Sequence, residues 1–185
     1  MLSVLQDGRA RMTRKMQRIC LWFYTQGEEA ARFYVSLLLD SRIDRVRYSE
    51  ADQSPSVIEF TLGGIGYVAL NAGPHLRLTE AVPISVLARD QAEIDRLWSA
   101  LTAEGGEGGR CGWLRDRFGL SWQILPTALP KLLAEADRDA AGRVAQAFME
   151  MGKVEIDDLE AAFANDARSR SSAEEPAPWE EPTDR

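Results

Sequence analysis

The stretch CGWLRDRFGLSWQILP, residues 111–126, decides how the rest of this sequence is interpreted. Its apolar residues flank a charged turn around Asp116 and Gly119, which predicts two short strands joined by that turn. Asp116 is expected to shape the turn and to pair with Arg115 or Arg117. The second strand is mostly apolar, as expected of a buried strand, yet it contains Gln123. A buried amide needs hydrogen-bond partners, so Gln123 either satisfies backbone groups or presents its amide to a ligand.

Length and composition indicate one soluble domain. The chain has 185 residues, 45% of them hydrophobic and 28% charged, enough to bury a sizeable core without metal or disulfide staples. The net charge of −7 argues against a nucleic-acid partner. No apolar run approaches the roughly 20 residues that cross a bilayer, and the N-terminus lacks the apolar stretch of a secretory signal. We therefore expect no membrane partner and a cytoplasmic location. Cys20 and Cys111 fit a reducing compartment, although a single buried disulfide stays open.

The two ends of the chain differ from its middle. Residues 1–15 are rich in Arg and Lys, and they are expected to form a flexible extension or to result from an upstream start codon. Residues 166–185 are acidic, Pro-rich and nearly free of aliphatic side chains. Such a segment cannot bury enough apolar area to offset its ordering entropy, so a disordered tail is favoured over an acidic interaction tail.

Residues 16–126 are expected to contain the same order of elements twice. The first unit would consist of a strand at 18–24, a helix at 27–39 and three strands at 41–48, 56–62 and 65–71. The second would consist of a strand at 83–89, a helix that begins after Asp90, and short strands near 108–117 and at 120–126. Asp90 and Glu93 have the spacing of a capping box. The sequence thus predicts an α+β fold built from two βαβββ units.

Residues 127–165 are predicted to be helical. Apolar residues recur at helical spacing in 139–151 and 156–163, so these helices need an apolar surface to cover. Either they cap their own barrel or they pack against a second subunit, and periodicity leaves both open. We expect a homodimer.

A resemblance covers roughly residues 16–163. The words CLWF, EEAARFY, SRID, ALNAGPH, QAEIDRLWSALTAEGG, CGWLRDRFGLSWQILP and ALPKLL occur in this order. They resemble the PhnB-like branch, also called the 3-demethylubiquinone 3-methyltransferase-like family, of the vicinal-oxygen-chelate superfamily, which contains glyoxalase and bleomycin-resistance proteins. The resemblance implies that each βαβββ unit curls an open sheet round a cleft, forming a glyoxalase-like open barrel that a second subunit often completes.

The resemblance also implies where a metal would bind. In metal-dependent members of the superfamily, the ligands lie on the first strand of each unit and at the end of its last strand. The matching places here are near Ile19 and Cys20, at Asn71, near Ile84 and Ser85, and at Gln123. None of them offers a histidine or a carboxylate, and neutral amides are weak ligands for a divalent ion. We therefore expect no tight metal site.

S-adenosylmethionine finds no support as a cofactor either. Enzymes of the Rossmann type bind adenosyl cofactors at a glycine-rich turn between a strand and a helix. The glycine runs at 62–66 and 104–109 instead join two strands and follow a helix. No cofactor is predicted.

Eight residues are candidates for the lining of the cleft, and no catalytic residue is assigned. His75, the single histidine, lies in a Gly-Pro loop, where a surface or hydrogen-bonding role is favoured over a general base or ligand. The two cysteines have no histidine beside them, so buried and inert thiols are favoured over nucleophiles. The tryptophans are expected in the core or an interface, unless one faces the cleft. The candidates are Cys20, Trp22, Asn71, His75, Ser85, Cys111, Trp113 and Gln123.

The sequence therefore predicts a protein that binds an unidentified small molecule without a tight metal. Asn71 and Gln123 are expected to face the cleft together and to give it a neutral polar lining. The alternative is an enzyme, either a methyltransferase as the family label suggests or a metal-assisted lyase or dioxygenase of the superfamily. A third hypothesis is a sequestering protein like the resistance members, which needs a cleft but no catalytic residues.

Overall fold

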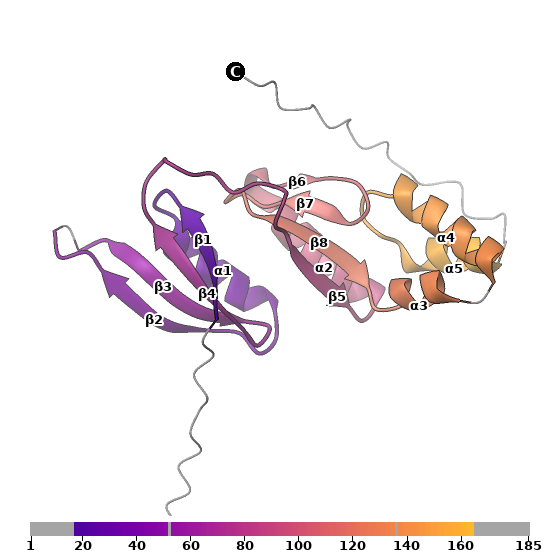
Figure 1. The fold of residues 1–185 in the computed structure, drawn as a ribbon, viewed down its shortest axis with the longest axis horizontal. Coiled ribbons are helices and arrows are strands. Elements are labelled where there is room, and N and C mark those ends of the chain that lie inside the picture. Colours follow the sequence, from indigo (N-terminus) through magenta and orange to yellow (C-terminus); the bar gives the residue numbers. More distant parts are fainter. Residues whose placement is uncertain (1–16, 52, 136, 165–185) are drawn as a thin grey trace, which may run out of the picture. The chain divides into compact units, whose positions relative to one another are not determined.

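The computed structural model describes residues 17–51, 53–135 and 137–164 (Figure 1). The chain divides into two compact units, one up to Gly73 and one from Pro74, and each is described by itself. The predicted flexible extension at 1–15 and the predicted disordered tail at 166–185 lie outside the described residues. No helix in the described part of the chain is long and apolar enough to cross a membrane.

The first unit is a four-stranded sheet with one helix on one face. Its elements are β1 (Ile19–Phe23), α1 (Gly27–Leu37), β2 (Arg42–Tyr48), β3 (Pro55–Leu62) and β4 (Ile65–Asn71), and the strand order is β1-β4-β3-β2. β1 and β4 are parallel, and the other pairs are antiparallel. Gly63 and Gly64 both have positive φ, which closes the tight hairpin between β3 and β4 as predicted. The fully buried Ala30 and Tyr34 of α1 pack on the sheet face that carries Ile58 and Ala69.

The second unit repeats this arrangement. Its elements are β5 (Ile84–Ala88), α2 (Gln91–Thr102), the short 3-10 helix η1 (Ala103–Gly105), β6 (Glu107–Gly108), β7 (Trp113–Arg115) and β8 (Ser121–Pro126). The strand order β5-β8-β7-β6 and the parallel pairing of β5 with β8 match the first unit. The fold class predicted from the sequence, α+β with two βαβββ units, is therefore confirmed.

The start of α2 is capped on both sides of Asp90. The Asp90 side chain accepts the backbone N–H of Glu93 at 2.8 Å, as the sequence predicts. The Glu93 carboxylate reaches one residue further back than in a capping box and accepts the backbone N–H of Arg89 at 2.9 Å. This hydrogen bond, followed by the one from the Arg89 side chain, lowers the pKa of Glu93 below its usual value.

Three helices follow β8 and belong to the second unit. They are α3 (Leu129–Ala134), α4 (Arg138–Glu150) and α5 (Ile156–Ala164), and they lie beyond the C-terminal end of β8 (Figure 1). The buried Leu129, Val144, Val154 and Leu159 form a small core of their own. We call residues 127–164 the C-terminal module. Its apolar stripes are thus partly covered within one chain, and the helical segments predicted from the sequence are confirmed.

Candidate functional site

The register of the second sheet places three predicted site residues side by side. Ser85 of β5 is the cross-strand neighbour of Gln123 in β8, and Gln123 is in turn the neighbour of Trp113 in β7. Residues paired across strands point to the same face of a sheet. Ser85, Gln123 and Trp113 therefore form one continuous row, which we call the Gln123 row.

The Gln123 row lies on the face opposite α2. Trp122 and Ile124, the chain neighbours of Gln123, are fully buried on the face that α2 covers, whereas Gln123 and Trp113 are half-buried and Ser85 is exposed. Leu87 and Leu125 belong to the same face one step along the strands, and Leu87 is 54% exposed. The row thus combines polar groups with apolar side chains that remain accessible.

Gln123 keeps hydrogen-bonding capacity in this position. The hydroxyl of Ser85 donates to its Oε1 at 3.4 Å. Its Nε2 donates to no acceptor in the part of the chain that the structure describes. A side-chain amide can donate two hydrogen bonds from this nitrogen. The row therefore presents unused donors next to Trp113, the cross-strand neighbour of Gln123. Among the described residues, the Gln123 amide bonds to no backbone group.

Asn71 lies on the face of the first sheet that α1 covers, whereas Gln123 lies on the face of the second sheet opposite α2. Its Oδ1 accepts the backbone N–H of Gly27 at 2.8 Å, at the first residue of α1. Its Nδ2 donates to the carbonyls of Thr25 at 2.9 Å and Pro55 at 2.8 Å. The amide of Asn71 thus ties the start of α1 to β3 and is fully used within the fold.

The first-unit counterpart of Gln123 is Val68. In the parallel pairs, Cys20 is matched with Val68 in the first unit as Ser85 is matched with Gln123 in the second. Glu59 of β3 is the next neighbour of Val68 and is held by salt bridges to Arg18 at 3.2 Å and Arg47 at 3.3 Å. No sequence pattern sets the register between β1 and β4, so the sequence alone does not distinguish Val68 from Asn71 as the counterpart of Gln123.

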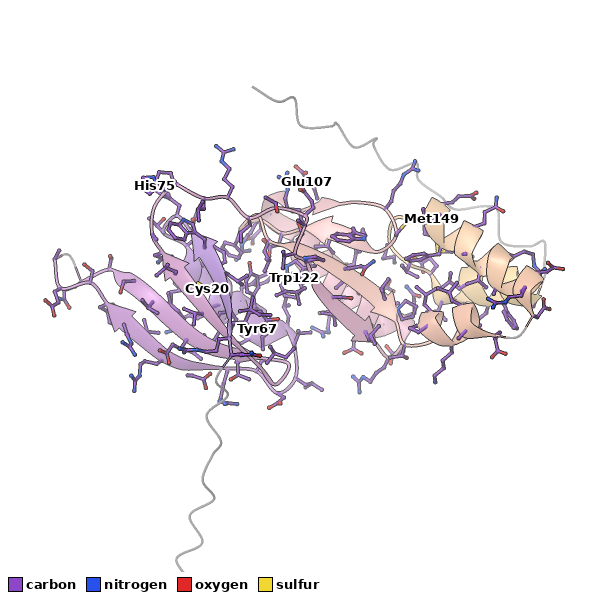
Figure 2. All side chains as sticks on the ribbon, in the orientation of Figure 1. Cys20, Tyr67, His75, Glu107, Trp122 and Met149 are labelled. Carbon is purple, nitrogen blue, oxygen red and sulfur yellow. The ribbon has the colours of Figure 1, made fainter. Side chains whose placement is uncertain are left out.

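The other predicted site residues lie outside the Gln123 row. The Trp22 indole donates to the carbonyl of Gly73 at 2.9 Å. His75 is exposed in the connection that follows β4 (Figure 2). Cys20 is exposed and Cys111 half-buried, so the favoured prediction of buried thiols is wrong, and both cysteines are free. Burial raises the pKa of Cys111, against a smaller opposite effect of Arg110, and such a thiol is a poor nucleophile at neutral pH.

Asp116 has a role that the sequence only half revealed. It is buried, and its carboxylate accepts the backbone N–H groups of Phe118 at 2.8 Å and Leu120 at 3.0 Å. It also accepts the indole N–H of the buried Trp122 at 2.8 Å. Arg115 forms a salt bridge with Glu107. Asp116 therefore shapes the turn, as predicted, and in addition fixes the core tryptophan next to Gln123.

The residues at the places where the superfamily binds a metal do not fit one. Cys20 and Val68 occupy these places in the first unit, and Ser85 and Gln123 occupy them in the second. None of these four side chains is an imidazole or a carboxylate. Within residues 17–51, 53–135 and 137–164, no group of three or more His, Cys, Asp or Glu side chains could hold a metal ion.

The strand-to-helix connections do not fit an adenosyl cofactor either. Tyr24 to Gln26 and Arg89 to Asp90 join strand to helix in the two units, and neither contains glycine. The first N–H of α1 is taken by Asn71, and the N-terminus of α2 is capped by Asp90. The carboxylate of S-adenosylmethionine would have to displace these internal acceptors to bind at either helix start.

Two glyoxalase-like βαβββ units define the class: this is a protein of the vicinal-oxygen-chelate fold. A family model described as 3-demethylubiquinone-9 3-methyltransferase matches residues 15–125, more than half of the chain. The chain therefore belongs to this family. The match ends before α3, so the C-terminal module lies outside it.

A solved structure supports the fold. A PhnB protein from Bacillus cereus, provisionally described as a 3-demethylubiquinone-9 3-methyltransferase, is 24% identical, with a TM-score of 0.57 over 61% of this chain and 100% of that one. The fosfomycin resistance protein FosX from Listeria monocytogenes is 14% identical, with a TM-score of 0.49 over 67% of this chain and 100% of that one. Among curated proteins, none matches.

Proposed function

We propose that the Gln123 row binds a small, flat, uncharged organic molecule that carries an acceptor oxygen, without a tightly bound metal ion. The observation that carries the proposal is the unused Nε2 of Gln123 beside the ring of Trp113. Such a pair suits a ligand that stacks on the indole and places a carbonyl or ether oxygen within reach of the amide. The row itself carries no formal charge, which favours a neutral ligand.

The accessible apolar side chains support the same ligand class. Leu87 and Leu125 flank the row on the same face, so a planar molecule laid on Trp113 and Gln123 would also cover leucine. Burial of apolar area contributes about 25 cal/mol per Å², so contact with these leucines would add to the affinity for a planar ligand.

The family name suggests methyl transfer to a demethylated ubiquinone, whose ring is flat and carries oxygen atoms. A ligand of that shape is compatible with the row. Transfer of a methyl group would further require a donor and a base beside the acceptor oxygen, and the row supplies neither an imidazole nor a carboxylate. Binding is therefore the function that these residues support best.

A homodimer belongs to the same proposal. Val82 and Leu87 of the second unit are 68% and 54% exposed, and a second subunit packed on them would remove this apolar area from water. Light scattering at micromolar concentration should give twice the mass of 20.6 kDa. A monomeric mass would contradict this part of the proposal.

Calorimetry with three matched probes tests the ligand class. Coumarin, which is neutral and carries a carbonyl, should bind more tightly than naphthalene, which has no acceptor, and than 2-naphthoate, which is charged. Gln123→Ala should weaken coumarin binding by about 1–3 kcal/mol, the penalty for an unmade hydrogen bond, and leave naphthalene binding nearly unchanged. Gln146→Ala is the matched control, because Gln146 is exposed on α4 and pairs only with Glu150. Equal affinity for all three probes would contradict the proposal.

Two further measurements address the enzyme alternative. Protein purified without a metal-affinity tag should contain much less than one equivalent of zinc, iron, nickel or manganese by elemental analysis. S-adenosylmethionine should show no saturable micromolar binding in calorimetry. Stoichiometric metal that resists a chelator, or binding of this cofactor that Gln123→Ala abolishes, would favour the enzyme instead.

A further inference from the structure

The segment that leads into Trp113 has an unusual backbone. Cys111 has φ of +55° and Gly112 has φ of +75°, so two consecutive residues are left-handed. This conformation costs a residue with a side chain roughly 1–2 kcal/mol, and it persists only where the surroundings hold it. Gly112 allows the carbonyl of Ile124 to approach, since a Cβ at this position would lie 2.4 Å from that oxygen. The carbonyl of Gly112 then accepts the N–H of Ile124 at 2.8 Å.

The C-terminal module holds this segment from the other side. The N–H of Cys111 donates to the carbonyl of Met151 at 2.7 Å, and the N–H of Gly112 donates to the carbonyl of Gly152 at 2.9 Å. The side chain of Val154 is fully buried, and it lies next to the position that a Cβ of Gly112 would occupy. We call residues 151–156 the strap. The carbonyls of Met151 and Gly152, both in the strap, therefore accept the N–H groups of both left-handed residues.

The strap is itself anchored to α2 by side chains. Gln91 donates to the carbonyl of Val154 at 3.2 Å and accepts the N–H of Ile156 at 2.9 Å. Lys153 forms a salt bridge with Asp95, one turn further along α2. Hydrogen bonds from Lys153 and then Gln91 lower the pKa of Asp95, so this carboxylate stays ionised at neutral pH. The strap therefore connects α2 on one face of the second sheet to the segment that enters β7.

We propose that the strap positions the Gln123 row. It holds the left-handed turn at Cys111 and Gly112 in place and thereby determines the orientation of the Trp113 side chain relative to Gln123. Trp113 follows Gly112 directly, and its backbone N–H donates to the backbone carbonyl of Arg110 across the same turn at 2.9 Å. A change in the backbone angles of this turn would change the direction in which β7 begins, because Trp113 is the next residue. The inference rests on the proposed function only in taking the row as the binding surface.

Gln91→Ala in the full chain tests the inference, with Gln146→Ala as the matched amide control. The first readout needs no ligand: NMR spectra should show shifted signals for the Trp113 indole N–H and the Gln123 side-chain amide in Gln91→Ala and not in the control. Hydrogen exchange of the Cys111 and Gly112 amides should become about tenfold faster, as expected where local opening becomes easier. Coumarin affinity should fall several-fold in Gln91→Ala while the control retains it.

The outcomes separate the two proposals. If the Trp113 and Gln123 signals of Gln91→Ala match those of the wild type although amide exchange is faster, the strap anchors the turn without positioning the row, and the inference is overturned. If these signals shift but the wild type binds no coumarin, positioning stands and the proposed function fails. Should Gln91→Ala be unstable, Lys153→Met with Lys131→Met as control repeats the test, since Lys131 is exposed on α3.

Discussion

The hydroxyl of Ser85 donates to Oε1 of Gln123 at 3.4 Å across the parallel pair β5 and β8, and this contact orients the amide so that its nitrogen is left for another partner. The equivalent pair in the first unit is Cys20 and Val68, which cannot form such a hydrogen bond. The duplication of the fold has therefore not duplicated the chemistry. Only the second sheet offers a side-chain amide in the row on the face opposite its helix.

The free energy of unfolding should depend strongly on the side chain of Asn71 and only weakly on that of Gln123. Asn71→Ala leaves the N–H of Gly27 and two carbonyls without their partner, so the free energy of unfolding should fall by about 1–3 kcal/mol. Gln123→Ala should change it by less than about 0.5 kcal/mol, because no internal group depends on Nε2. Urea unfolding of the two variants measures the difference. A Gln123→Ala variant as unstable as Asn71→Ala would show that Gln123 has a structural role.

Asp116 should be among the most sensitive positions of the second unit. Asp116→Ala removes the acceptor of two backbone N–H groups and of the Trp122 indole, which predicts a loss of about 2–4 kcal/mol in unfolding free energy. Asp137→Ala is the control, because this exposed N-cap of α4 should cost only about 1 kcal/mol. Thermal or urea unfolding ranks the two. Equal losses would mean that the contact with Trp122 contributes little.

Two glycines provide a matched test of the turn before Trp113. Gly112→Ala should lower stability by at least about 2 kcal/mol, because its φ is +75° and the new Cβ would lie 2.4 Å from the carbonyl oxygen of Ile124. Gly142→Ala should raise it by about 0.5–1 kcal/mol, because Gly142 is inside α4 with nothing within 4 Å. Tolerance of alanine at residue 112 would contradict the backbone described for this turn.

Cys111 should alkylate slowly until the solution is strongly alkaline. Burial raises the pKa of its thiol, so the reactive thiolate should be scarce at pH 7 and should increase only as the pH passes the usual value of 9.0. Because the pKa of Cys111 is raised in the folded state, this thiol contributes to the stability of the folded state below that pH. The contribution is lost as the pH rises through the raised pKa. Iodoacetamide kinetics on a Cys20→Ser variant isolate this thiol. A rate that levels off below pH 8 would contradict the assignment.

Much of the fold follows from local patterns, whereas the site depends on register. Asp90 with Glu93 and the pair Gly63-Gly64 mark the start of a helix and a hairpin, because capping and tight turns are set by neighbouring residues. The helix predicted to reach residue 39 ends at Leu37, and Leu39 is 78% exposed, since hydrophobicity alone does not mark where a helix stops.

The side of the sheet that Asn71 faces could not be read in the same way. A shift of one residue in pairing moves a side chain to the other face, and no local pattern sets the pairing of β1 with β4 across the intervening helix. The strap was missed for a similar reason: the partners of Gln91 are Val154 and Ile156, far along the chain. Residues joined only by tertiary packing leave no periodic signal in the sequence.

The most direct test of the account is an NMR titration of the wild-type chain with coumarin, which follows the side-chain amides of Gln123 and Asn71 and the indole N–H of Trp113. Asn71 serves as the internal control, since its amide is already bonded to Gly27, Thr25 and Pro55. The account predicts saturable shifts of the Gln123 and Trp113 signals with one common Kd and an unchanged Asn71 signal. Saturable binding that leaves Gln123 and Trp113 unchanged would contradict it.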